Sequence, residues 1–278
     1  MCNSCEKISF LSLHIEMMRY ALFEKYPALF ALSTEREGGV SKGNYASLNM
    51  CDYTGDNPLS VETNRQIFCE KHRIAREQLF MPHQTHGSCV RVLDEPFLQL
   101  SPALQCERLH GVDALVTDRK NVCIGISTAD CVPLLLFDPV QEVVAAVHAG
   151  WRGTLAKIVT STVETMSICF GSLPTHLLVQ IAPCISEENY EVGRDLYELF
   201  RQKGFPVEQL FFEKNNGKFH FDLKAANRFL LLEAGVLPDR IAVSECCTFR
   251  DFDRFFSARK LGIDSGRMFS CMMLRKER

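Results

Sequence analysis

The sequence lacks a long hydrophobic run, an excess of basic residues and a regular spacing of cysteines. No uninterrupted apolar stretch approaches the roughly 20 residues of a membrane-spanning helix, so we predict no membrane partner. With 31 basic and 34 acidic residues the formal charge is −3, whereas nucleic-acid-binding domains usually carry a basic excess. We therefore predict no nucleic-acid partner. The 13 cysteines are odd in number and irregularly spaced, which argues against a disulfide framework and favours a reducing compartment.

The N-terminal region also lacks the apolar segment of a secretory signal, because charged residues interrupt it repeatedly. We therefore predict a cytoplasmic protein. Cys2 and Cys5 form a C-x-x-C pair, but no second pair follows at finger-like spacing, which does not favour a zinc finger there. A chain of 278 residues, 46% hydrophobic, can form a core without disulfides.

Hydrophobic periodicity predicts a mixture of helices and strands without regular βαβ alternation. Helices are expected at 6–25, 59–73, 153–171, 193–203 and 224–234, with Thr154 capping the third and Gly171 ending it. Strands are expected at 88–93, 121–128, 132–138, 142–149, 176–183, 240–245 and 268–274, with a further strand pair around 215–217. This pattern predicts an α+β fold in which helices pack outside a central sheet system.

The strands at 132–138 and 142–149 carry the most informative pair of residues. If they form a hairpin whose turn is centred between Pro139 and Val140, Cys131 lies opposite His148. Opposed Cβ atoms are about 4.5–5.5 Å apart, so the thiolate and the imidazole could share a metal ion or form a nucleophile pair. A buried structural Cys and a core His fit the spacing equally well.

Polar residues around this pair suggest an active site. Asp130 precedes the cysteine, and Arg152 lies at the start of the next predicted helix, where it could hold an anion with the free amides. His83 and His86 both lie in the turn "PHQTHG", and either could supply a third ligand from a loop.

At this point the sequence resembles the laccase-domain proteins, the so-called multicopper polyphenol oxidases, also described as purine nucleoside phosphorylases. The blocks "TADCVPLLLFDP" and "VAAVHAGWRGTL" are similar to the signature blocks of that family. Further similar blocks, in order, are "REGGVS", "SLN", "GDNPLSVETNR", "HQTHG", "IAPCISEENYEVG", "CCTF", "FFSARK" and "SGRM". The resemblance covers roughly residues 30–274. It implies an N-terminal extension of residues 1–28 and one catalytic domain of residues 29–278.

The resemblance implies a layered α/β sandwich with a mixed central sheet, like the cytotoxic necrotizing factor deamidases. It implies a metal site of His86, Cys131 and His148, so that His86 rather than His83 is the loop ligand. Zinc is the expected metal, with copper as the alternative. The implied activities are phosphorolysis of adenosine, inosine and methylthioadenosine, together with deamination of adenosine. Purine nucleosides and phosphate are therefore the expected partners.

We take Asp130 or Asp113 as the acid/base group, and Arg36, Arg152 and Arg259 as candidates for phosphate binding. Asn49 of the "SLN" block is a further substrate-binding candidate. The chain departs from the family pattern by one residue inserted before Arg36 and by Ala258 and Lys260 in "FFSARK".

Three alternative readings stay open. Cys131 could be the catalytic nucleophile of a metal-free hydrolase or deamidase, activated by His148. The cluster could bind copper for phenol oxidation, although multicopper chemistry needs several sites. The metal site could be structural in a non-catalytic protein, in which case His83 is the candidate fourth ligand.

Overall fold

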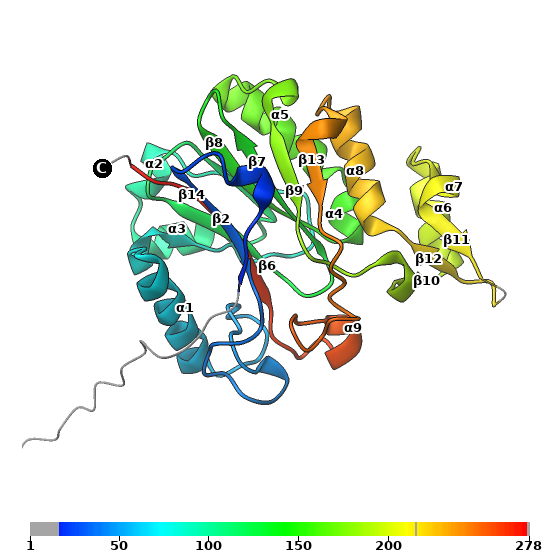
Figure 1. Ribbon diagram of the computed structural model, residues 1–278, viewed down its shortest axis with the longest axis horizontal. Coiled ribbons are helices and arrows are strands. Elements are labelled where there is room, and N and C mark those ends of the chain that lie inside the picture. The colour runs from blue at the N-terminus through cyan, green and yellow to red at the C-terminus, as the bar shows by residue number, and fades with distance from the viewer. Residues whose placement is uncertain (1–16, 215, 277–278) are drawn as a thin grey trace, which may run out of the picture.

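Two β-sheets packed face to face form the centre of the molecule, and helices cover their outer faces (Figure 1). The computed structural model describes residues 17–214 and 216–276, so Cys2 and Cys5 lie outside the described residues. The six-stranded sheet has the order β13 (Ile241–Val243), β9 (Leu178–Ile181), β7 (Val132–Asp138), β8 (Val143–Ala149), β5 (Ala114–Thr117), β4 (Val90–Val92). The five-stranded sheet has the order β1 (Met17–Met18), β2 (Leu29–Thr34), β14 (Met268–Leu274), β6 (Cys123–Thr128), β3 (Leu79–Phe80). Both sheets mix parallel and antiparallel pairs, which confirms the predicted α+β class with two sheets in the central layer.

Side chains of β7 point alternately to the two sides of the six-stranded sheet, as the strand geometry requires. Leu135 and Phe137 pack between the two sheets, whereas Leu134 and Leu136 pack toward the helices. The whole strand is buried, which confirms the expectation that it is covered on both faces.

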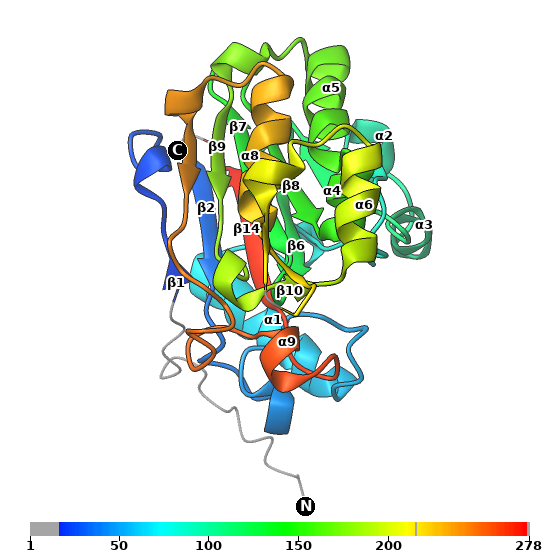
Figure 2. The same ribbon diagram turned by 90° about the vertical axis from the view of Figure 1, so that its right-hand side faces the viewer.

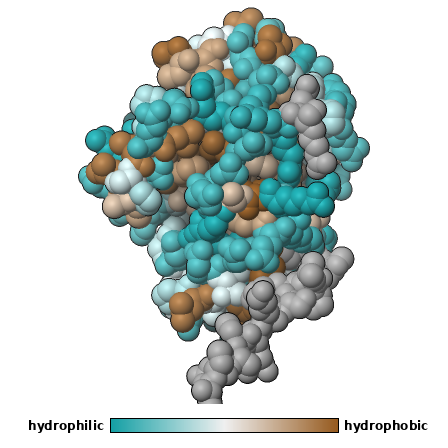
Figure 3. Space-filling view, turned by 90° about the vertical axis from the view of Figure 1, so that its left-hand side faces the viewer, coloured by the Kyte–Doolittle hydropathy of each residue, from teal (hydrophilic) through white to brown (hydrophobic). Residues whose placement is uncertain are grey.

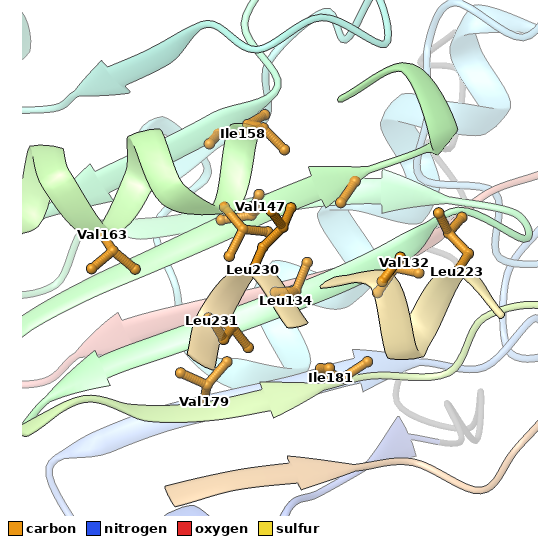
Figure 4. Packing of buried hydrophobic residues seen from close by; sticks show 14 of the residues in the cluster. Val132, Leu134, Val147, Ile158, Val163, Val179, Ile181, Leu223, Leu230 and Leu231 are labelled. Carbon is orange, nitrogen blue, oxygen red and sulfur yellow. The ribbon is translucent and has the colours of Figure 1, made fainter. Parts of the chain in front are cut away.

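Helices α5 (Ile158–Phe170) and α8 (Leu223–Glu233) cover the outer face of the six-stranded sheet (Figure 2). Figure 4 shows Leu230 and Leu231 of α8 close to Val147 and Val179 of the strands beneath. This apolar layer fixes the ends of β7 and β8 against the helices.

Helix α1 (Pro58–His72) covers the outer face of the five-stranded sheet. Asn57 caps its start by accepting a hydrogen bond from the amide of Leu59, and Arg73 ends it in the left-handed conformation. Phe68 packs edge-on against Phe269 of β14, with ring centroids 5.4 Å apart.

A small three-stranded sheet of β10 (Glu191–Val192), β12 (Phe219–Phe221) and β11 (Phe211–Glu213) lies beside the main sheets (Figure 1). It packs with α6 (Arg194–Gln202) and α7 (Val207–Leu210) through aromatic side chains such as Phe200. The predicted strand pair and the predicted helix at 193–203 are both present.

Three local predictions were wrong. The helix expected at 153–171 is two helices, α4 (Trp151–Leu155) and α5, because Lys157 adopts a left-handed conformation with φ 59°. Gly150, rather than Thr154, is the N-cap of α4, whereas Gly171 ends α5 as predicted. The hairpin register differs by two residues, because His148 pairs with Pro133 and not with Cys131.

The described part of the helix expected at 6–25 is also not an α-helix. Residues 17–18 form β1, residues 21–23 form a single 3₁₀ turn, and residues 1–16 lie outside the described residues. Tyr20 and Phe23 are buried between the two sheets, so this part of the predicted N-terminal extension contributes to the core.

Three short helices, α2 (Glu95–Leu98), α3 (Pro102–Arg108) and α9 (Ala258–Leu261), lie in the connections. Among residues 17–214 and 216–276 there is no helix with the length and apolarity to cross a bilayer. The face shown in Figure 3 is mainly hydrophilic, with hydrophobic residues in separate small groups.

Candidate metal centre

His86, Cys131 and His148 converge on one point at the end of the space between the two sheets. His86 comes from the loop between β3 and β4, Cys131 directly precedes β7, and His148 is near the end of β8. One ligand atom from each residue lies within 4.8 Å of the other two. A thiolate and two imidazoles are typical zinc ligands, so a single ion could bind all three side chains after small shifts.

Asp113 holds two of these ligands in place from behind. Its Oδ1 lies 2.7 Å from Nδ1 of His148 and also accepts a hydrogen bond from the amide of His86. Its Oδ2 accepts from the amides of Gly87 and Thr85. Because Nδ1 of His148 is engaged, Nε2 is the nitrogen free for a metal, which is the usual carboxylate–histidine–metal arrangement.

Asp113 is fully buried and its oxygens are engaged with the protein. This location does not fit contact with a substrate, and Asp113 is therefore better placed to orient His148 than to act as the acid/base group suggested by the sequence.

The cluster changes the acidity of its own members. Burial alone would raise the pKa of the Cys131 thiol, but the imidazoles of His148 and His86 outweigh it and lower that pKa to about 6. Burial would likewise lower the pKa of His148, but the Cys131 thiolate and Asp113 outweigh it and raise that pKa to about 9. The side chains therefore favour a thiolate, the form that binds metals and acts as a nucleophile.

Gly150 leaves room for the cluster. A Cβ atom at this position would lie 2.9 Å from Sγ of Cys131 and 3.1 Å from Cδ2 of His86. The backbone of Gly150 has φ −74° and ψ 174°, which any residue can adopt. Space, rather than backbone conformation, therefore requires glycine here.

The cluster lies in the wall of a cavity of about 790 Å³. This volume is within the range of small-molecule sites, about 300–1,000 Å³. Its lining includes the following residues outside the cluster: Tyr53, Gln84, Ser127, Thr128, Asp130, Trp151, Tyr190, Ala258, Arg259, Ile263, Asp264 and Arg267.

Asp130 and Arg259 are the predicted substrate-side residues that the structure brings to the cavity. Asp130 has φ 85°, and its carboxylate accepts hydrogen bonds from Oγ1 of Thr248 and from the amide of Arg259, both at 2.7 Å. The Arg259 guanidinium lies over the ring of Tyr190 and donates to the carbonyl of Glu191. These contacts link the loop before Cys131, α9 and β10 around one opening.

Arg36, Asn49 and Arg152 do not line the cavity. Arg36 donates to the carbonyls of Ala46 and Phe252, so its guanidinium fastens two loops together. Asn49 is fully buried, and its amide donates to oxygens of neighbouring loop residues. Arg152 lies over the ring of Trp151, with its guanidinium carbon 4.3 Å from the ring centroid. These positions correct the expectation of direct substrate contact for the three residues.

His83 is not part of the cluster. Its ring stacks between Tyr53 and His110, with centroid distances of 4.3 and 4.6 Å. Among the described residues His86, Cys131 and His148 are the only group of three or more His, Cys, Asp or Glu side chains arranged to hold an ion. A fourth protein ligand, which a closed structural zinc site would need, is therefore not present in that group.

The sequence did not single out Tyr53, Ser127 or Tyr190, which also line the cavity. Tyr53 bonds Ser127 across 3.0 Å, and Gln84 bonds the backbone of Ser127 in both directions. Gln84 lies in the "HQTHG" block, which was a signal for it, whereas the other residues lie in segments far apart in the sequence.

A layered sandwich of two mixed sheets, with a three-ligand cluster open to a cavity at the end of the inter-sheet space, defines a class of candidate single-site metalloproteins. Within that class, the chain belongs to the multi-copper polyphenol oxidoreductase laccase family, whose pattern matches residues 30–275.

Several characterised relatives are similar over almost the whole chain. A purine nucleoside phosphorylase of Bacteroides thetaiotaomicron is 40% identical, over 94% of this chain and 97% of the relative. Adenosine deaminase RL5, from an unknown prokaryotic organism, is 38% identical over 92% of this chain and 98% of the relative. The crystal structure of YlmD from Geobacillus stearothermophilus superimposes with a TM-score of 0.85 at 32% identity, over 94% of this chain and 96% of that one.

Proposed function

We propose that this chain is a zinc-dependent purine nucleoside enzyme. It would phosphorolyse adenosine, inosine and methylthioadenosine to free base and ribose 1-phosphate or its methylthio analogue, and it would deaminate adenosine. The observation that carries the proposal is the convergence of His86, Cys131 and His148 in the wall of a cavity of nucleoside size. Relatives named for phosphorylase and deaminase activity, at 40% and 38% identity, support the choice of substrate class.

The donor set fits zinc. One thiolate and two imidazoles match its preferred ligands, and three protein ligands leave a fourth position for a reactant. Zinc bound in this way supplies Lewis acidity at that position. Copper also binds sulfur and imidazole, but multicopper oxidation needs further sites, and the described residues contain one such group. We therefore favour single-metal chemistry over phenol oxidation.

The chain's own residues would orient the reactants and move protons. Asp113 fixes the ring of His148 through Nδ1. Asp130 lines the cavity next to Cys131 and is our candidate acid/base group. Arg259 lines the same opening and is our candidate for phosphate, because its fork of donors matches phosphate oxygens. The eleven cysteines in the described part of the chain are free, which supports the proposed cytoplasmic location.

Metal analysis combined with a nucleoside panel tests the proposal. Wild type and Cys131→Ala would be assayed with adenosine, inosine and methylthioadenosine, with and without phosphate. We expect near-stoichiometric zinc in wild type, free base only with phosphate, and ammonia from adenosine without phosphate. Cys89→Ala is the matched control, because Cys89 is exposed and outside the cluster. Wild-type protein that turns over no nucleoside, or that is fully active without metal, would overturn the proposal.

A second candidate function is a metal-free cysteine hydrolase or deamidase. The specific observation in its favour is the chain Cys131, His148 and Asp113, which has the order of a nucleophile, a base and an orienting carboxylate. Under this alternative, chelator-treated protein stays active and alkylation of Cys131 abolishes the activity. Full dependence on added zinc would rule it out.

A further inference from the structure

Thr128 carries a buried hydroxyl without a hydrogen-bond partner at the edge of the metal cavity. It is the last residue of β6, and its side chain belongs to a residue that is 2% exposed. In the described part of the chain, seven buried side-chain nitrogen or oxygen atoms lack a partner, and only Thr128 among these residues lines the cavity. An unpaired buried hydroxyl costs stability, so its presence calls for an explanation.

The position of Thr128 in the strand directs its side chain toward the cluster. Ile124 and Ile126 of the same strand pack between the two sheets, and alternation places Thr128 on that same face. His148 also lies on the inter-sheet face of its strand, because Val144 and Ala146 do. The hydroxyl and the ligand cluster therefore meet at the same end of the inter-sheet space.

Other hydroxyls nearby are all engaged with the protein. Ser127, on the opposite face of β6, bonds Tyr53 at 3.0 Å and Gln84 at 3.1 Å. Between the sheets, Tyr20 donates to Ser33 at 2.6 Å, and Ser33 lies 2.5 Å from the hydroxyl of Ser270. The chain thus satisfies these groups internally and leaves the hydroxyl of Thr128 without a partner.

We propose that Oγ1 of Thr128 hydrogen-bonds a ribose hydroxyl of the bound nucleoside. This inference rests on the proposed function. Phosphorolysis breaks the bond at C1′, so the sugar must lie close to the cluster, and its 2′- and 3′-hydroxyls are within two carbons of C1′. A threonine hydroxyl both donates and accepts, as a sugar hydroxyl does. Thr128 precedes Cys131 by three residues, which places it beside the sugar and not at the distant end of the substrate.

Kinetics of Thr128→Val and Thr128→Ser with inosine, 2′-deoxyinosine and 3′-deoxyinosine would test this pairing. We expect the valine variant, which keeps the shape and loses the hydroxyl, to reduce kcat/KM for inosine about tenfold. The serine variant should stay close to wild type. With the deoxynucleoside that lacks the paired hydroxyl, the valine substitution should have little further effect, because both changes remove the same hydrogen bond.

Thr117→Val is the matched control. The hydroxyl of Thr117 is buried but bonded, donating to the carbonyl of Leu93 at 2.7 Å, and it lies outside the cavity. We expect this variant to lower the Tm and leave kcat/KM unchanged. Thr128→Val should do the reverse, because it removes a hydroxyl that the unliganded protein does not satisfy.

The outcomes separate this inference from the function on which it rests. Wild-type turnover of inosine with unchanged kcat/KM in Thr128→Val, or losses that add for both deoxynucleosides, would overturn the role of Thr128 alone. A lower Tm for Thr128→Val equal to that of Thr117→Val would also contradict it. A wild-type enzyme without nucleoside turnover would overturn the proposed function itself.

Discussion

Each oxygen of Asp113 binds a different part of the metal centre. One holds the ring of His148 and the amide of His86, and the other holds the amides of Gly87 and Thr85. A single carboxylate therefore fixes both the strand ligand and the loop ligand. Partners of this kind usually matter nearly as much for metal affinity as the ligands themselves.

Asp113→Asn should weaken zinc binding by about 10- to 100-fold. The amide keeps the size of the side chain, but it has one acceptor oxygen where the carboxylate has two, so some of the present hydrogen bonds must be lost. Competition with a chromogenic chelator measures the affinity. Asp118→Asn is the control, since Asp118 pairs with Arg119 outside the cavity. Equal zinc affinity in the two variants would contradict the role given to Asp113.

Cys131 in the metal-free protein should react as a thiolate from slightly acidic pH upward. Its pKa is lowered to about 6, because the imidazoles outweigh the opposing effect of burial. Alkylation by iodoacetamide, followed at this residue by peptide mass, should therefore rise with a midpoint near that pH. His148→Asn removes the neighbouring cationic charge and should move the midpoint upward. The same midpoint in both proteins would show that His148 does not stabilise the thiolate.

At the scale of elements, the hairpin of β7 and β8 shows what the sequence could predict. Apolar runs predicted both strands with nearly their observed bounds, because strand patterns are local. The register was wrong because the turn is longer than expected. Asp138 accepts hydrogen bonds from the amides of Val140 and Gln141, and Glu142 adopts φ 52°. A shift of two residues keeps His148 on the predicted face, so the convergence with Cys131 does not depend on the error.

The junction of β8 and α4 gives a further prediction, for Gly150→Ala. The added methyl group would lie 2.9 Å from Sγ of Cys131, so it should displace the ligands and lower the bound zinc while the fold persists. Metal content and far-UV circular dichroism of the purified variant measure the two effects. Gly193→Ala is the matched control, because Gly193 also caps a helix with an ordinary φ and its added methyl would meet only the side chain of Asp195. Full zinc content in Gly150→Ala would show that the cluster tolerates the methyl group.

At the scale of the whole molecule, long-range contacts decide what the sequence leaves open. The ligands were predicted because each lies in a motif with a recognisable resemblance. The order of strands in the two sheets depends on pairs such as Cys271 with Leu32, far apart in the chain, and no local pattern specifies it. For the same reason Arg36 was expected at the substrate, whereas the fold uses it to tie loops together. Tyr190 was missed because only the packing of the small sheet brings it to the cavity.

The three ligands come from segments that unfolding separates, so zinc should stabilise the whole fold. A ligand that binds only the native state at 100 times its Kd adds about 2.7 kcal/mol. For a domain of this size that corresponds to a rise in Tm of roughly 5–10 °C. Calorimetry of zinc-loaded and chelator-treated protein measures the difference. His83→Ala, whose histidine stacks outside the cluster, should keep the whole rise, and Cys131→Ala should lose most of it. A rise of equal size in Cys131→Ala would mean that the stabilising ion binds elsewhere, because the thiolate is the one sulfur ligand of the cluster.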